Sequence, residues 1–167
     1  MERREFLGSV TALTVGVVLV PRIARGASRG APLAHGVSLA AAAPLPLMTV
    51  YKSPSCGCCK DWIKHIEKAG FTTKTVDMED LTQVKKDAGV PEDLQSCHTA
   101  LVGAYVIEGH VPADLVKKLL EEKSKLTGLA VGGMVVGSPG MEQGSMKQPY
   151  NVMAFTKGGK SMVYARR

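Results

Sequence analysis

Three cysteines lie within four positions, in a Cys-Gly-Cys-Cys cluster at 56–59, where the hydrophobic pattern changes from strand to helix. The residues before the cluster, 47–51, form a short β-type run that ends at a Ser-Pro-Ser turn. From the last cysteine onward, apolar residues recur at helical spacing until Gly70, a typical helix end. The sulfurs are therefore predicted at a helix N-terminus, where the helix dipole and free backbone N–H groups favour thiolate over thiol.

The rest of the pattern predicts an α/β fold. The expected strands are 71–76, a pair within 99–111 that is broken by glycines at 103 and 109, 152–156 and 161–164, and the expected helices are 81–88 and 112–125. The order strand, turn, cysteine cluster, helix, strand resembles the opening of the thioredoxin fold. We therefore expect a thioredoxin-like domain that carries a C-terminal glycine- and methionine-rich extension.

That extension is the glycine-rich stretch 128–144, which contains Met134 and Met141 and for which no helix or strand is expected. Loops of this length are more often functional than idle. The stretch lacks the glycine and lysine spacing of a phosphate-binding loop. The stretch is therefore not expected to bind nucleotide phosphates.

The N-terminal residues have the layout of an export signal. A basic start is followed by an uncharged run at 8–20, shorter than the ~20 apolar residues of a spanning helix, so no permanent membrane anchor is expected. Arg3-Arg4-x-Phe6-Leu7 resembles the bacterial twin-arginine signal, with an ordinary secretory signal as the alternative. We predict an export signal and linker at 1–46, a folded domain at 47–167, and a periplasmic location.

Composition argues against a nucleic-acid partner. The net charge is +6 and the aromatic fraction only 5%, with a single Trp62. Residues 1–47 and 48–167 each carry a net charge of +3, so the folded part is only mildly basic, with both signs interspersed. Neither a strong electrostatic patch nor a base-stacking surface is expected.

The four cysteines do not fit a framework of structural disulfides. Three of them crowd the cluster and only Cys97 remains as a distant partner, while adjacent Cys58 and Cys59 make a strained pair. Cys56 and Cys59 have the Cys-x-x-Cys spacing of a redox dithiol and are the candidate catalytic residues. A thioredoxin-type thiol-disulfide oxidoreductase is thus one hypothesis.

Two features count against a simple exchanger. Cys58 adds a third thiol that would compete for the disulfide, and no proline lies between Pro91 and Pro112, where exchangers have a substrate-docking proline. Cys97 and His98 occupy that stretch instead. Metal handling is therefore favoured over peptide-disulfide exchange.

The donor set indicates a soft metal. Four sulfur ligands, or three with His98, would suit zinc, but five of the eight methionines lie within 134–162. Thiolate plus thioether is the combination that selects copper(I). The candidate metal ligands are Cys56, Cys58, Cys59, Cys97, His98, Met134 and Met141.

Other histidines are not expected to bind metal. His65 is predicted at the surface, paired with Asp61 one helical turn earlier, and His110 has no obvious companion ligand. His98 can share a metal with Cys97 only if the chain is still in a loop there, because neighbours on a strand point to opposite faces.

The whole pattern resembles the CopG family of periplasmic copper-resistance proteins. The matching segments are Tyr51-Lys52-Ser53-Pro54-Ser55-Cys56-Gly57-Cys58-Cys59, Cys97-His98-Thr99, Gly109-His110-Val111-Pro112 and Gly137-Ser138-Pro139-Gly140-Met141-Glu142. The resemblance implies a thioredoxin-like domain whose four cysteines and C-terminal extension bind copper, and which cycles copper between its two oxidation states. Copper efflux or chaperone proteins are the implied partners. A passive metal buffer is a further alternative to the copper oxidoreductase.

Overall fold

A computed structural model describes residues 44–167 of the chain. The predicted export signal and most of the linker lie outside the described residues. The elements, in chain order, are β1 (Met48–Lys52), α1 (Gly57–Lys68), β2 (Thr73–Asp77), α2 (Thr82–Asp87), the 3-10 turn η1 (Glu92–Leu94), β3 (His98–Val102), β4 (Tyr105–Glu108), α3 (Ala113–Glu122), β5 (Gly128–Ala130), β6 (Asn151–Phe155) and β7 (Ser161–Arg166).

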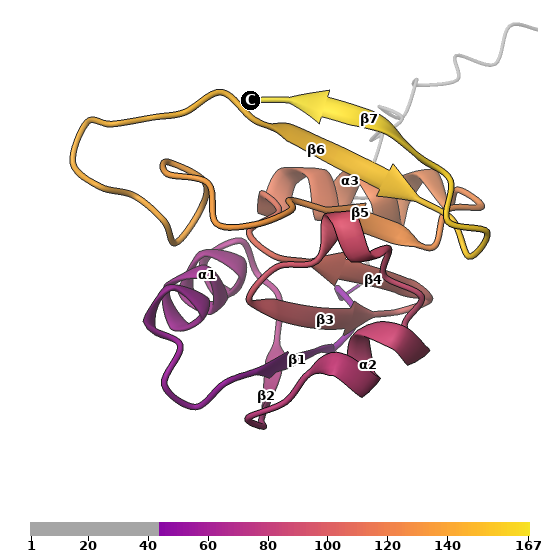
Figure 1. Cartoon of the computed structure of the whole chain (residues 1–167), viewed down its shortest axis with the longest axis horizontal. Coiled ribbons are helices and arrows are strands. Elements are labelled where there is room, and N and C mark those ends of the chain that lie inside the picture. Colours follow the sequence, from indigo (N-terminus) through magenta and orange to yellow (C-terminus); the bar gives the residue numbers. More distant parts are fainter. Residues whose placement is uncertain (1–43) are drawn as a thin grey trace, which may run out of the picture. The chain divides into compact units, whose positions relative to one another are not determined.

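These elements build a mixed α/β domain on one seven-stranded sheet with the order β2-β1-β3-β4-β5-β6-β7. Figure 1 shows the strands following one another from β2 at the bottom to β7 at the top. The pairs β1–β2 and β4–β5 are parallel, and the other four pairs are antiparallel. The expected α/β fold class is confirmed.

Alternating strand residues create a separate hydrophobic cluster on each face of the sheet. The larger cluster joins β1 and β3 to the apolar sides of α1 and α3, with Trp62, Ile66 and Leu119 fully buried. The smaller cluster includes Val106, Phe155 and, after α2, Val90. Burial of these apolar faces holds α1, and hence its cysteines, at the ends of β1 and β3.

The structure contains one strand that the sequence analysis did not predict. The glycine-rich stretch begins with β5, whose three small or apolar residues are all buried between β4 and β6. A Cβ atom at Gly128 would lie 1.9 Å from the carbonyl oxygen of Val106, so only glycine permits this close pairing. Three residues without alternation give too weak a periodic signal to predict a strand.

Most other element boundaries agree with the prediction to within a few residues. Helix α1 begins at Gly57 rather than at the last cysteine, so Cys58 and Cys59 both lie in its first turn. Helix α3 ends at Glu122 because Lys123 adopts a left-handed conformation with φ of 47°. In the part of the chain that the structure describes, no helix combines the length and apolar character needed to cross a membrane.

Candidate metal centre

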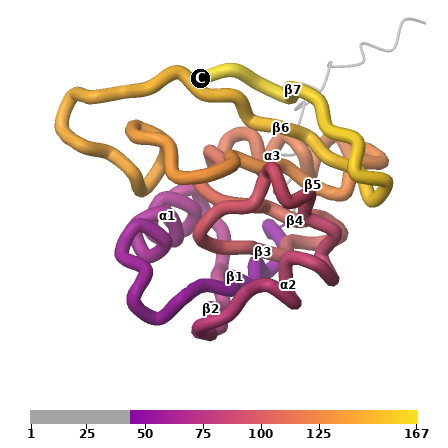
Figure 2. Tube along the Cα trace, viewed as in Figure 1, coloured from indigo at the N-terminus to yellow at the C-terminus, as the bar shows by residue number. Residues whose placement is uncertain are grey.

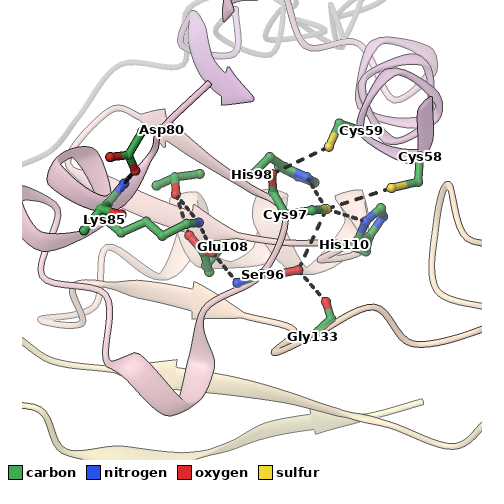
Figure 3. A network of polar contacts seen from close by, with 12 residues as sticks. Cys58, Cys59, Asp80, Lys85, Ser96, Cys97, His98, Glu108, His110 and Gly133 are labelled. Atoms are coloured by element: carbon green, nitrogen blue, oxygen red, sulfur yellow. Dashed lines mark hydrogen bonds and ion pairs between the residues drawn. The ribbon is translucent and has the colours of Figure 1, made fainter. Parts of the chain in front are cut away.

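The four cysteine sulfurs gather where β1 ends, α1 begins and β3 starts. Figure 3 shows Cys58, Cys59 and Cys97. Cys56 is the N-cap of α1, and a disulfide joins it to Cys59. The Cys58 sulfur is free and lies 3.5 Å from that of Cys56 and 4.0 Å from that of Cys97. The first turn of α1 carries no acidic residue.

Cys97 also contacts two imidazoles. Its sulfur lies 3.4 Å from Nδ1 of His98 and 3.1 Å from Nε2 of His110. Cys97 precedes the first residue of β3 and is still in the loop, so its side chain can lie beside that of His98. This loop conformation at Cys97 is the condition under which Cys97 and His98 can share one metal ion.

His110 is the site residue that sequence reasoning missed. It was predicted to have no companion ligand, yet the turn between β4 and α3 places its ring against Cys97. Its Nδ1 pairs with the carbonyl oxygen of Pro139 at 2.8 Å. A backbone carbonyl of this kind fixes the ring orientation of metal-binding histidines. Since 13 residues separate His110 from Cys97, no local spacing rule could reveal the pair.

The predicted pairing of His65 with Asp61 is wrong. Asp61 forms its ion pair with Lys64 at 2.8 Å, whereas Nε2 of His65 accepts a hydrogen bond from the backbone N–H of Ala113. His65 is half-buried and links α1 to the start of α3. Packing of the two helices on one sheet face, which the sequence does not show, decides this contact.

Burial sets the protonation of the site in the metal-free protein. It raises the pKa of the Cys97 thiol to about 12, and the nearby Cys58 sulfur adds to the shift. Burial also lowers the pKa of His98 well below its usual value and lowers that of His110. Neutral imidazoles are the form that binds metal, so both rings can offer a lone pair at neutral pH.

A buried ion pair holds the segment that carries Cys97 (Figure 3). Glu108, fully buried, accepts a hydrogen bond from the backbone N–H of Ser96 at 2.6 Å and from the Lys85 ammonium at 2.5 Å. The Thr99 hydroxyl donates to the other carboxylate oxygen at 2.7 Å. Glu108 therefore connects α2, β3 and the residue before Cys97 through a single side chain.

The extension passes over α1, as Figure 2 shows for the orange loop. A Cβ atom at Gly140 would lie 2.5 Å from the backbone nitrogen of Trp62 and 2.9 Å from the carbonyl oxygen of Cys58, so the loop backbone lies directly against the helix. At the start of the loop, the carbonyl oxygen of Gly133 accepts a hydrogen bond from the Ser96 hydroxyl. The loop thus contacts both α1 and the segment that carries Cys97.

The two methionines that were predicted as ligands differ in exposure and in their neighbours. Met134 follows Gly133 and is therefore one residue from the Ser96 contact, but its side chain is 62% exposed. Met141 is half-buried and follows Gly140, the residue that touches α1. Ligation by either methionine remains a prediction.

The donors present fit a soft or borderline metal. Among residues 44–167, two groups have all their ligand atoms within 4.8 Å of one another, the four cysteines and the set Cys97, His98 and His110. Sulfur and imidazole suit copper and zinc, and neither group includes the carboxylates that magnesium or calcium requires. The site is therefore chemically able to hold copper.

Comparison with known proteins agrees with this chemistry. Two solved structures of the copper resistance protein CopG, forms 1 and 2, are each 43% identical to the chain with a TM-score of 0.70. Each match covers 74% of this chain and 98% of the CopG chain. The chain belongs to the CopG family of copper resistance proteins.

The other comparisons add little to this assignment. Residues 94–141 match a family of unknown function, DUF411, and this segment spans Cys97, His110 and part of the extension. No curated protein matches the chain. The CopG-family resemblance seen in the sequence is confirmed by the two solved structures.

The Gly140 contact yields a first prediction. In Gly140→Ala the new methyl group must push the loop away from α1, and overpacking of this kind costs about 1–3 kcal/mol. Because the carbonyl oxygen of Pro139 pairs with Nδ1 of His110, displacement of the loop is also expected to loosen the His110 ring beside Cys97. Urea unfolding of the metal-free protein measures the loss of stability, and the NMR signals of the His110 ring report its displacement.

Gly144→Ala is the matched control for this loop. Gly144 has a φ of +58° and Gly140 one of +83°, but a Cβ atom at Gly144 meets nothing within 4 Å. Both substitutions strain the backbone, and only the first creates a clash. Equal losses in the two variants would contradict a specific contact between the loop and α1.

Proposed function

We propose that the chain is a periplasmic copper-binding protein of copper resistance that holds copper(I), in a multinuclear cluster, on Cys56, Cys58, Cys59 and Cys97. Thiolates are the soft ligands that select copper(I). The observation that carries the proposal is the convergence of all four sulfurs in a family whose solved members are copper resistance proteins. The proposal includes export by the N-terminal signal within the signal and linker region at 1–46, and exchange of copper with efflux or chaperone proteins.

We also propose a thioredoxin-like core formed by the elements from β1 to α3. The sheet order β2-β1-β3-β4 supports it, with α1 crossing between the parallel strands β1 and β2. Cys97 lies beside the cysteine cluster, with its sulfur 4.0 Å from that of Cys58. In a thioredoxin-like core, its segment would correspond to the one that carries the docking proline of an exchanger. In this arrangement a metal ligand replaces a substrate-binding residue.

Oxidation of the Cys56–Cys59 dithiol can be coupled to the reduction of copper(II). Two thiolates, Cys56 and Cys59, form one sulfur–sulfur bond and release two electrons, which reduce two copper(II) ions to copper(I). The reverse step takes two electrons from two copper(I) ions and breaks the disulfide. The short approach of Cys58 to Cys56, 3.5 Å between sulfurs, supports electron exchange between a cluster and this bond.

Elemental analysis with an optical spectrum tests the metal. The full chain is produced in copper-supplemented cells, exported and purified without chelator, and several copper ions per chain are expected. One zinc ion and no copper would overturn the proposal, because a four-sulfur site is also a good zinc site.

Two further assays separate the alternatives. A thiol-disulfide oxidoreductase predicts that the metal-free protein catalyses the reduction of insulin disulfides, whereas we expect no catalysis. A passive buffer predicts that the reduced protein binds copper without reducing copper(II). We expect one disulfide to form for every two copper(II) ions reduced under anaerobic conditions.

A further inference from the structure

Strand β7 is an edge of the sheet that no other described strand covers. It ends the strand order and, among residues 44–167, pairs only with β6. Figure 1 shows it at the top of the sheet. Strands β4, β5 and β6 separate it from β3, so this edge is distinct from the metal centre. An edge strand offers unpaired backbone N–H and C=O groups to another chain.

The hydrogen bonds of the hairpin show which backbone groups of β7 point outward. In an antiparallel pair, residues that bond to the neighbouring strand alternate with residues whose N–H and C=O groups face away from it. At the turn, the Thr156 N–H donates to the carbonyl oxygen of Lys160 at 3.0 Å. Counting from there along the register, the Met162 N–H points toward β6, and the backbone groups of Ser161 and Val163 point outward.

The middle of β7 is apolar and exposed on both faces of the sheet. Met162 is 61% exposed and lies opposite Ala154, a residue of the larger hydrophobic cluster. Val163 is 43% exposed and lies opposite Met153, which packs against the smaller cluster on the other face. Charged side chains commonly protect a sheet edge from pairing, and the opposite edge strand, β2, carries a lysine and an aspartate. Residues 161–165 carry no charge.

Positive charge flanks this apolar segment at both ends. Lys160 precedes β7 and Arg166 ends it, and both residues are exposed. Neither forms an ion pair within residues 44–167. The α3 carboxylates that contact this part of the chain are already bound: Asp114 by Arg167 at 2.5 Å, and Glu122 by the Tyr164 hydroxyl at 2.8 Å. The two cations are therefore available to a partner.

A second copy of this chain does not suit the edge. If two β7 strands paired antiparallel about Val163, each Lys160 would lie opposite an Arg166, and like charges directly opposite one another destabilise a strand pair. Parallel pairing in register would place each cation beside its equivalent. The flanking charges therefore favour a partner strand of opposite charge.

We propose that β7 is a docking edge for a partner protein, which adds to the sheet an extended segment with apolar residues in its middle and acidic residues at both ends. Addition of a strand to an exposed edge is a common mode of peptide recognition. The backbone of the segment pairs with Ser161 and Val163, and its apolar side chains cover Met162 and Val163. Its carboxylates neutralise Lys160 and Arg166. This docking edge does not depend on the proposed copper function.

The test uses the metal-free full chain, isotope-labelled for NMR, and the synthetic peptide Asp-Glu-Val-Thr-Ile-Asp-Glu. The peptide Lys-Lys-Val-Thr-Ile-Lys-Lys is the control of opposite charge. We expect the acidic peptide to bind at least about fivefold more tightly at low salt, because the basic one meets like charges, and salt to reduce this difference. Strand pairing is expected to slow hydrogen exchange at the Ser161 and Val163 amides. Exchange at Met162, whose N–H already points toward β6, should change little.

Variants separate the backbone contribution from the charges. Val163→Pro removes one outward N–H and keeps the bonds to β6, so it is expected to weaken binding of the acidic peptide about two- to tenfold. The double variant Lys160→Glu with Arg166→Glu is expected to reverse the preference, so that the basic peptide binds more tightly. Lys68→Glu with Lys74→Glu makes the same change of net charge in α1 and β2 and should leave the preference unchanged. Circular dichroism checks that each variant is folded.

Several results would overturn the inference. One is equal binding of the two peptides, and another is unchanged exchange at Ser161 and Val163 in the complex. A dimer in solution that protects these amides without peptide would identify β7 as an interface between copies instead. Binding to phosphatidylglycerol vesicles without binding to the acidic peptide would identify a membrane-facing surface. None of these measurements involves copper, so a copper(I) titration of the same protein shows separately whether the proposed function fails.

Discussion

Replacing Glu108 with alanine is expected to destabilise the metal-free protein by about 3–5 kcal/mol, because the Lys85 ammonium would remain buried without its counter-ion. The side chain of Lys85 is 8% exposed and that of Glu108 is fully buried. The backbone N–H of Ser96 and the Thr99 hydroxyl would lose their acceptor as well. Urea unfolding, followed by far-ultraviolet circular dichroism, measures the loss.

Two comparisons keep this prediction testable. The double variant Lys85→Met with Glu108→Leu replaces the pair by apolar groups of similar size and is expected to recover most of the stability. Asp61→Ala, which removes a carboxylate from the exposed ion pair with Lys64, is expected to have a much smaller effect. A loss below about 1 kcal/mol in Glu108→Ala would show that the buried pair is not essential to the fold.

The Cys58→Ser variant is expected to lose multinuclear copper(I) binding while it keeps its fold. The Cys58 sulfur lies 3.5 Å from that of Cys56 and 4.0 Å from that of Cys97, so it is the bridge between the helix cysteines and the β3 loop. Serine has nearly the same size but does not supply a soft thiolate. Titration of the reduced protein against a coloured copper(I) chelator should show several copper ions per chain falling to at most one.

Ser55→Ala is the control for this cysteine. Ser55 lies in the turn before α1 and is exposed, and its hydroxyl lies 2.9 Å from that of Ser53. It should leave the copper number unchanged. A Cys58→Ser protein that still binds several copper(I) ions would contradict the assignment of Cys58 as the bridging ligand.

Local features of the chain were predictable because their physical causes act over a few residues. The helical spacing after the cysteine cluster predicted α1, and the Lys-Gly-Gly-Lys turn predicted the hairpin of β6 and β7. Strand β5 escaped prediction, since its three residues owe their conformation to the close approach of Val106 rather than to a pattern of their own. The type of most elements, helix or strand, followed from the local sequence, but the pairing of the strands did not.

The candidate site divides in the same way. Spacing and ligand chemistry alone identified the cluster at 56–59 as a set of soft donors. They also identified Cys97 and His98 as candidate ligands. Glu108 accepts hydrogen bonds from the backbone N–H of Ser96 and from Lys85. These contacts depend on the pairing of β3 with β4 and on the packing of α2. No pattern in the sequence marks a glutamate in a strand as buried and paired.

The sequence by itself predicted that the cysteines at 56–59 lie at the start of a helix and that their sulfurs suit a soft metal. Only the tertiary structure decided that Cys97 would contact His110 and that Pro139 would hold this histidine in place. The reason is physical: helix periodicity and ligand softness are properties of neighbouring residues. The Cys97–His110 contact joins segments 13 residues apart and is created by the antiparallel pairing of β3 with β4.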